Sequence, residues 1–248
     1  MEKKKAEIII INELKDLLTG KCISDIINFE TDNIYNKSAV SVIVRNYINN
    51  NSIYNVETLD DYNIRLKFIS VNSDYKCFEA LSFSHSSLYK ILFEDWCSSD
   101  LLEQPNLRKQ LNFNFLLIPI IKDKQKGVFN NNLAWKIGNF SYWKPKAKEL
   151  ELIGEEWYLT KKVIQEGVKL NIVKFGNSFR NKNNLPKQSE TNFIHLRPHG
   201  KNSYDYDLEY LEYTNGNIEI TKQSFWLNKK YINLLLKDYK WKINLKGE

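Results

Sequence analysis

The stretch Ile64-Arg65-Leu66-Lys67-Phe68 decides the kind of fold that this sequence can adopt. Its apolar and basic residues alternate with a period of two, and successive side chains of a strand point to opposite faces. The stretch therefore predicts a β-strand that buries one face and presents two cations on the other. The interpretation that these cations form an ordinary solvated strand face stays open.

Further strands and helices are predicted on both sides of this strand. The run Phe113–Ile121 is almost wholly apolar, which predicts a buried strand with Pro119 near an edge or an end. Asn36 is a candidate N-cap for a helix whose apolar positions follow the i, i+3, i+4 rule. These apolar positions are Val40, Ile43, Val44, Tyr47 and Ile48.

The rest of the chain predicts a mixture of both element types. Helices are expected over residues 5–19, 155–166 and 228–239, the first two closed by Gly20 and Gly167. Strands are expected over 169–175, 193–197 and 217–221, with a polar loop over 198–215. Because the elements are interspersed without a Pro- or Gly-rich linker, we expect a mixed α/β fold with a central sheet flanked by helices, in a single domain over 1–248.

The composition suits a folded protein with a basic surface. Of the 248 residues 42% are hydrophobic and 13% aromatic, which is enough for a core. Lys and Arg number 36 against 30 Asp and Glu, so the net charge of +6 suits a polyanionic partner. A merely basic protein without such a partner is the plainer interpretation.

The cysteines and the hydropathy indicate the cellular setting. Cys22, Cys77 and Cys97 have no CxxC spacing, which argues against a disulfide framework and a zinc site and favours a reducing compartment. We find no signal peptide, and the apolar run Ile8–Ile11 is too short to cross a bilayer. We therefore expect a cytoplasmic protein without a membrane partner.

The C-terminal part carries two motifs in a fixed order. The segment His195–Ser203 has the sequence HLRPHGKNS, and Phe225–Leu227 has the sequence FWL. A strand that ends in LRP, a loop, a second strand with FYL or FWL, and a closing helix together form the C-terminal signature of the MutH/Sau-three-A-I family of mismatch-repair and restriction endonucleases. The sequence resembles that signature in both motifs and in their separation.

The resemblance extends over most of the chain. Leu18–Ile23 is similar to the family's early L-x-GKT-[IL] stretch, and Asn36–Arg45 resembles its NKG-x-[IV]-G-x-[LIV]-[LIV]-E helix. Ile64–Lys67 resembles its [IV]ELK strand, and Gly154–Trp157 its tryptophan-bearing helix. The segments occur in the family's order, so the resemblance implies a restriction-endonuclease-like fold.

The family's catalytic positions are altered in this chain. The family cuts DNA with a D-x6-E-x-K constellation and a helix Glu, whose carboxylates hold Mg²⁺. By the resemblance, Arg45 occupies the helix Glu position, Thr58 the Asp position and Arg65 the strand Glu position, and only Lys67 is kept. Two cations and a hydroxyl would repel a metal ion. The resemblance thus implies no catalytic residue, no metal site and no cofactor.

Two other hypotheses stay open. Glu57, Asp60 and Asp61 lie near Thr58, and a shifted register could recruit them in an active, Mg²⁺-dependent endonuclease. A slip by one residue would, however, turn the strand inside out. The other hypothesis is a scaffold subunit of a restriction system whose surface binds protein and not DNA.

The resemblance implies DNA binding in place of cleavage. Family enzymes that cut GATC carry a second, degenerate copy of the fold that binds another DNA site and stimulates the first. This chain resembles such a copy, which would bind double-stranded DNA at GATC-like sites and partner a catalytic nuclease domain or subunit. Arg45, Arg65 and Lys67 would then contact phosphates.

Base recognition by the same resemblance belongs to loop 198–204 and the strand that follows it. His199, Lys201 and Asn202 lie on the loop, where donors suit guanine and Asn suits adenine, and Trp226 replaces a Tyr that contacts a base. A loop histidine that caps a backbone group is the plainer interpretation of His199.

Of the neighbours Phe225 and Trp226, strand alternation predicts that one lies in the core.

Further residues are expected to contact DNA on weaker grounds. Lys109 lies near a family lysine that approaches the scissile phosphate. We expect loop 198–204 and Trp226 to face the same cleft as Arg45 and Arg65. The remaining residues expected to contact DNA are Arg197, Lys222 and Lys229.

Overall fold

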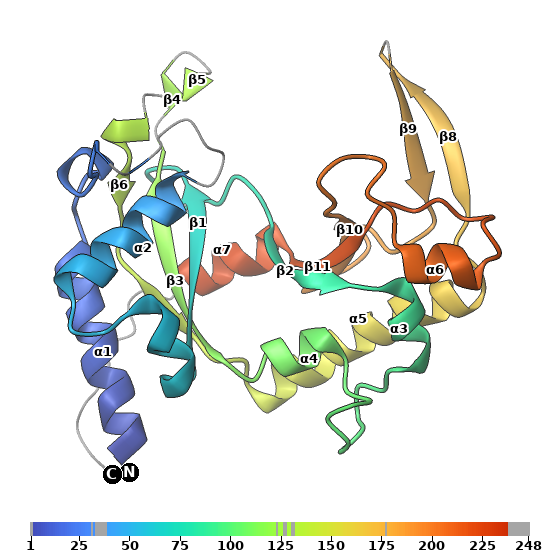
Figure 1. Cartoon of the computed structure of the whole chain (residues 1–248), viewed down its shortest axis with the longest axis horizontal. Coiled ribbons are helices and arrows are strands. Elements are labelled where there is room, and N and C mark those ends of the chain that lie inside the picture. The colour runs from blue at the N-terminus through green and yellow to red at the C-terminus, as the bar shows by residue number, and fades with distance from the viewer. Residues whose placement is uncertain are drawn as a thin grey trace. The chain divides into compact units, whose positions relative to one another are not determined.

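The computed structural model describes residues 2–30, 32, 39–122, 124–125, 128–129, 132–176 and 178–237 (Figure 1). The chain forms two compact units. Unit 1 holds residues 1–79, 113–144 and 232–248, and unit 2 holds residues 80–112 and 145–231. Helices and strands are mixed along the chain, which confirms the expected fold class. The interpretation of 1–248 as one domain stays a prediction.

Unit 1 is built on a mixed sheet whose central strand is β3 (Asn114–Ile121). β3 pairs in parallel with β1 (Ile64–Val71) along its whole length. On its other side it pairs antiparallel with β6 (Lys136–Ile137) and β7 (Ser141–Trp143). Every residue of β3 except the last is buried, as expected for a strand covered on both faces.

Pro119 is accommodated near the end of β3, although the strand is a central one and not an edge. β7 pairs with residues 115–117 of β3 and β6 with residues 120–121. Pro119 therefore lies where one partner has ended and the other has not begun. There its carbonyl accepts a hydrogen bond from the backbone of Gly138 (2.8 Å), and its missing N–H leaves these two ladders intact.

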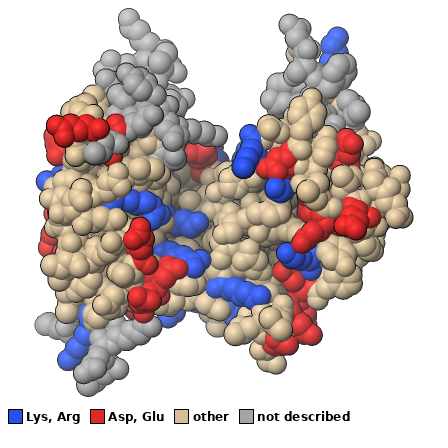
Figure 2. All heavy atoms as spheres, in the orientation of Figure 1, with Lys and Arg blue, Asp and Glu red and all other residues tan. Residues whose placement is uncertain are grey.

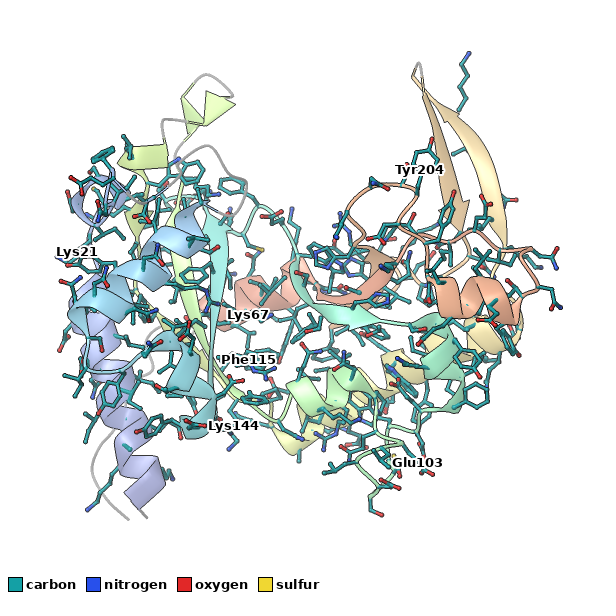
Figure 3. All side chains as sticks on the ribbon, in the orientation of Figure 1. Lys21, Lys67, Glu103, Phe115, Lys144 and Tyr204 are labelled. Carbon is teal, nitrogen blue, oxygen red and sulfur yellow. The ribbon has the colours of Figure 1, made fainter. Side chains whose placement is uncertain are left out.

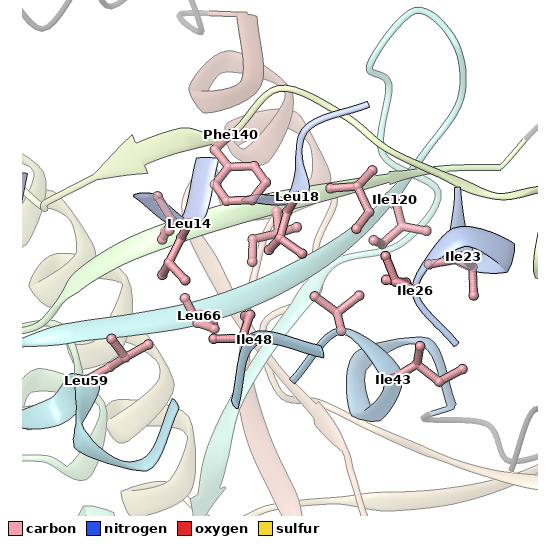
Figure 4. Packing of buried hydrophobic residues seen from close by; sticks show 14 of the residues in the cluster. Leu14, Leu18, Ile23, Ile26, Ile43, Ile48, Leu59, Leu66, Ile120 and Phe140 are labelled. Atoms are coloured by element: carbon pink, nitrogen blue, oxygen red, sulfur yellow. The ribbon is translucent and has the colours of Figure 1, made fainter. Parts of the chain in front are cut away.

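Two helices pack against this sheet. α1 (Glu2–Leu18) ends before Gly20, whose φ of +84° confirms the predicted stop. α2 (Ala39–Asn51) buries the predicted apolar face, and Asn36 lies outside the described residues. Figure 4 shows the shared core. Its buried side chains include Leu14, Leu18, Ile43, Ile48, Leu59 and Leu66.

Shorter elements complete unit 1. Those of 3-10 type are η1 (Ile23–Asp25), η2 (Val56–Tyr62) and η3 (Asn132–Ala134). β4 (Lys124–Gln125) pairs with β5 (Val128–Phe129). Across the described part of the chain, no helix has the length and apolar character that a membrane span requires.

Unit 2 is built on an antiparallel sheet in the order β10-β11-β2. The three strands are β10 (Ile194–Pro198), β11 (Gln223–Leu227) and β2 (Leu81–Ser86). The helices around them are α3 (Leu88–Phe93), α4 (Asn106–Gln110), α5 (Ala147–Gln165) and α6 (Leu208–Tyr213). α5 packs on β10 and α3, α4 packs on β2, and α6 packs on α3. α7 (Lys229–Lys237) follows β11, and residues 238–239 of the predicted helix lie outside the described part.

A separate hairpin belongs to the same unit. Among the described residues, β8 (Leu170–Phe175) pairs with β9 (Ser178–Asn183) and with no other strand. α5 ends before Gly167, whose φ is +100°, as predicted. The sequence predicted β8 but did not predict its partner β9.

The prediction of an uninterrupted loop over 198–215 is wrong, because α6 forms within it. The carboxylate of Asp207 accepts a hydrogen bond from the backbone of Tyr210 (3.3 Å), and the Tyr210 side chain is buried. The same carboxylate accepts a bond from the backbone of Leu88 (2.7 Å) at the start of α3. One buried Asp therefore satisfies the first turns of two helices.

The prediction of a strand over 217–221 is also wrong. The carbonyl of Ile220 accepts a hydrogen bond from the backbone of Asp207 (2.9 Å), so this segment bonds to the start of α6. Only Thr221 forms an isolated bridge, to Tyr206. The strand that follows loop 198–204 is β11, which carries the FWL motif.

A buried carboxylate determines where β10 begins. Glu156 of α5 accepts hydrogen bonds from the backbone nitrogens of Asn192 (2.6 Å), Phe193 (3.0 Å) and Ile194 (2.8 Å). Glu156 is 8% exposed, so these donors replace the water that an ionised carboxylate otherwise needs. The start of β10 is thereby attached to the middle of α5.

We predict that Glu156→Gln lowers the free energy of unfolding by about 2–3 kcal/mol, because an amide would turn its own NH₂ group toward backbone donors. Chemical denaturation measures the loss. Glu155→Gln is the matched control, since Glu155 is exposed on the same helix. Equal stability of the two variants would contradict the role of Glu156.

Candidate functional site

Unit 1 gathers three of the predicted cations. Arg65 and Lys67 lie two residues apart on β1 and point to the same side of the strand, as the alternation predicts. Arg45 comes from α2, and its guanidinium lies 5.5 Å from the centroid of the Phe68 ring. Figure 3 shows Lys67 on β1, the strand next to the one that carries Phe115. The positions that the resemblance assigns to two acids thus carry guanidinium groups beside the retained lysine.

Arg65 is held in one orientation by two contacts. Its Nε and Nη2 donate to the two carboxylate oxygens of Asp60 (3.2 and 3.0 Å). Its guanidinium also stacks 3.5 Å from the centroid of the Phe113 ring. A bidentate pair and a ring face restrain a guanidinium more than a single contact does. Figure 2 shows the resulting neighbourhood of basic and acidic side chains on the face of unit 1 that carries α2, η2 and β1.

Lys67 is electrostatically destabilised in its charged form. Burial lowers the pKa of its amine from 10.5 to about 8, and repulsion by Arg65 and Arg45 acts in the same direction. Ile69 and Val71 follow on the same face of β1 and are buried, which explains why the amine is poorly hydrated. An anion placed among the three cations would raise this pKa and favour the charged amine.

Thr58 and the nearby Asp60 have other partners in this structure. Thr58 is exposed on η2, and its hydroxyl donates to the carbonyl of Asn55 (2.9 Å). Asp60, which a shifted register would recruit, is held by Arg65. Ile64 and Leu66 are buried, so β1 keeps the register that places Arg65 and Lys67 on the polar face. Among the described residues, no group of three or more His, Cys, Asp or Glu is placed to hold a metal ion.

In unit 2 the indole of Trp226 is covered by two predicted DNA-binding side chains. The Arg197 guanidinium lies 4.5 Å from the Trp226 ring centroid, and the His199 ring centroid lies 5.1 Å away. Nδ1 of His199 is 3.0 Å from the hydroxyl of Ser224. Phe225 is fully buried and Trp226 half-buried, which confirms the predicted alternation.

Loop 198–204 is organised by Asp205. Its carboxylate accepts a hydrogen bond from the backbone of Lys201 (2.9 Å) and pairs with Nζ of Lys222 (2.6 Å). The bond from Lys222 is the main reason that the pKa of the Asp205 carboxyl is lowered. Oδ1 of Asn202 accepts from the backbone of Tyr204 (2.9 Å). Sequence analysis missed Asp205, because its partner Lys222 is remote in sequence.

Close packing restricts the same loop at Gly200. A Cβ at this position would lie 2.8 Å from Cγ2 of Thr221 and 3.0 Å from Cβ of Asp205. A larger residue would therefore displace the loop from the strand that follows it. The loop is held at both its backbone and its side chains, and it presents exposed Lys201 and Asn202 side chains.

The other predicted residues lie elsewhere in unit 2. Lys109 on α4 and Lys222 line one cavity of about 510 Å³, together with Lys90 and Glu94. Lys229 is the first residue of α7. Arg45, Arg65 and Lys67 belong to unit 1, whereas the loop and Trp226 belong to unit 2. The expectation that both groups face one cleft stays a prediction.

We predict that Lys67→Met raises the free energy of unfolding at pH 7 by about 1–3 kcal/mol, since it removes a charge whose pKa is lowered on folding. For the wild type the unfolded chain binds more protons between about pH 8 and 10.5, so stability should rise with pH across that window. Lys67→Met should lose this rise. Denaturation at several pH values measures it, with exposed Lys5→Met as the control. A Lys67 variant with unchanged pH dependence would contradict the assignment.

Comparison with known proteins gives one relationship. No family model matches the chain. The chain is similar to the type II restriction enzyme Sau3AI of Staphylococcus aureus, with 25% identity over 209 residues that cover 74% of this chain and 40% of that enzyme. The chain therefore matches less than half of the length of this relative. With the mixed α/β fold, the match supports a distant relationship to the Sau3AI/MutH-like family.

Proposed function

We propose that this chain binds double-stranded DNA, without cutting it, as a recognition domain or subunit of a type II restriction enzyme, at GATC-like sites. The observation that carries the proposal is the cluster of Arg45, Arg65 and Lys67. By the resemblance, these residues stand at positions that belong to the family's active site. A nuclease fold that exchanges metal-binding acids for cations keeps its attraction for phosphate and loses the means of cleavage.

Electrostatics supports a phosphate as the ligand of this cluster. Burial, followed by repulsion from Arg65 and Arg45, lowers the pKa of Lys67 to about 8. A phosphodiester placed among them would neutralise that repulsion, and the planar fork of an arginine suits its oxygens. Asp60 offsets only part of the positive charge and orients Arg65. The cluster therefore fits an anion better than it fits a cation or an apolar partner.

The loop of unit 2 is a suitable element for recognising bases. Asp205 and Ser224 restrain the backbone and the side chain of the loop before any ligand arrives. A restrained loop loses less conformational entropy on binding than a mobile one. Trp226 is covered by Arg197 and His199. We therefore assign it the role of a platform that positions these two side chains, and the base contacts to His199, Lys201 and Asn202.

Catalysis in such a system would come from another part of the enzyme. The relative Sau3AI is a type II restriction enzyme, and this chain matches 40% of it. The alternative, an active endonuclease that uses displaced acids, would need Asp60 to leave its bidentate pair with Arg65. It would also need an Mg²⁺ ion to approach two guanidinium groups, which Coulomb repulsion opposes.

Binding of DNA should depend on pH through Lys67. If only the charged amine binds phosphate, affinity should fall about tenfold between pH 7 and pH 9, since the free amine titrates near pH 8. Lys67→Arg keeps its charge and should show little change over this range. Fluorescence anisotropy with a GATC duplex measures both. A wild type and a Lys67→Arg variant with the same pH profile would exclude Lys67 as a phosphate contact.

Two classes of variant should differ in their sequence dependence. Arg65→Ala and Lys67→Ala should weaken binding to GATC and scrambled duplexes alike and reduce the salt dependence. Ala at His199, Lys201 or Asn202 should instead reduce the preference for the specific site by roughly 1–3 kcal/mol per good base contact. Equal losses on both duplexes in both classes would remove the loop from recognition. No loss in either class would favour a protein-binding scaffold.

A further inference from the structure

The segment between α5 and β10 has an unusual charge pattern. From Gly167 to Ser189 the sequence contains no Asp or Glu, although the whole chain has 30 of them. Its cations are Lys169, Lys174, Arg180, Lys182 and Lys187. None of these residues belongs to the DNA-binding set assigned above, so the segment needs its own explanation.

This segment forms the hairpin β8–β9. The two strands pair with each other and join no other sheet among the described residues. Figure 1 shows the hairpin standing out from the rest of unit 2. Each strand has six residues, which corresponds to a length of about 20 Å. Lysines on exposed strand edges also prevent aggregation, so their presence alone does not identify a ligand.

The base of the hairpin is attached firmly to the body of unit 2. Asn184 accepts a hydrogen bond from the backbone of Lys169 (2.8 Å) and donates to the carbonyl of Gly167 (3.3 Å). These bonds join the exit of β9 to the entry of β8 at the end of α5. The hairpin therefore leaves the body at a defined place, next to the segment that leads into β10.

A groove lies at the base of the hairpin, and the Lys and Arg side chains that line it face no Asp or Glu in its lining. It has a volume of about 250 Å³ and is lined by Lys182 of β9, by Lys187 and by Arg197 of β10, with no Asp or Glu. Lys182 and Lys187 are exposed. Arg197 is also the residue that stacks on Trp226 at the start of loop 198–204. The groove thus continues directly into the proposed recognition loop.

We propose that this groove and the β8–β9 ribbon bind the phosphate backbone of the DNA that flanks the site recognised by loop 198–204. The inference rests on the proposed function and extends it beyond the family's catalytic region. A two-stranded ribbon is narrow enough for a DNA groove. Each DNA strand advances about 3.4 Å along the helix axis per nucleotide. A protein ribbon about 20 Å long therefore reaches roughly six base pairs of the flanking DNA.

The test compares two duplexes that share the same central site. The short duplex has about two base pairs on each side, and the long one about ten, so that only the long one spans the ribbon's reach of roughly six. The variant is Lys182→Gln with Lys187→Gln. The control is Lys148→Gln with Lys162→Gln, which removes equal charge from exposed, ion-paired lysines on α5. Thermal melting checks that all variants fold.

We expect the wild type to bind the long duplex more tightly than the short one. The Lys182/Lys187 variant should lose about tenfold on the long duplex, with its salt slope reduced by about two, and little on the short one. The control should retain the wild-type difference. If wild type binds DNA but the variant behaves like the control on both duplexes, the groove is no phosphate site and the proposed function still stands. If wild type binds neither duplex, both proposals fail.

Discussion

The parallel pairing of β1 with β3 is the constraint on which the cationic cluster depends. β3 is buried along nearly all of its length, so β1 can pair with it only in the register that places Ile64 and Leu66 in the core. A slip by one residue would turn Arg65 and Lys67 to the face that now carries Ile64 and Leu66. The burial of Ile64 and Leu66 therefore determines which face of β1 carries Arg65 and Lys67. The charges of the two cations play no part in that choice.

Three carboxylates position the groups around them in this protein. Asp60 orients Arg65, Asp205 organises the loop that carries Lys201, and Glu156 anchors the start of β10. Each one is satisfied by hydrogen bonds or by a cation in the protein. Asp60 offsets only part of the repulsion among Arg45, Arg65 and Lys67. That remaining positive charge is the physical basis of the proposal that the cluster binds an anion.

Much of the architecture could be predicted from local patterns. Alternation identified β1 and predicted that one of Phe225 and Trp226 is buried, and glycines identified the ends of α1 and α5. That Arg45, Thr58 and Arg65 stand where the resemblance places acids is likewise a statement about the sequence alone. These features are local because strand alternation and helix termination depend on residues only a few positions apart.

What the sequence by itself determined is therefore most of the longer elements, the face of β1 that carries Arg65 and Lys67, and the chemistry of those two side chains. Tertiary structure alone decided which groups meet. Lys222 reaches Asp205, and Glu156 reaches Ile194, across separations that no local pattern records. The sequence did not predict α6, whose N-cap Asp207 also accepts a hydrogen bond from Leu88 of α3. It did not predict β9 either, because the pairing of β9 with β8 is not visible in either strand alone. The physical reason is that hydrogen bonds and ion pairs form between groups that folding brings together, whatever their distance along the chain.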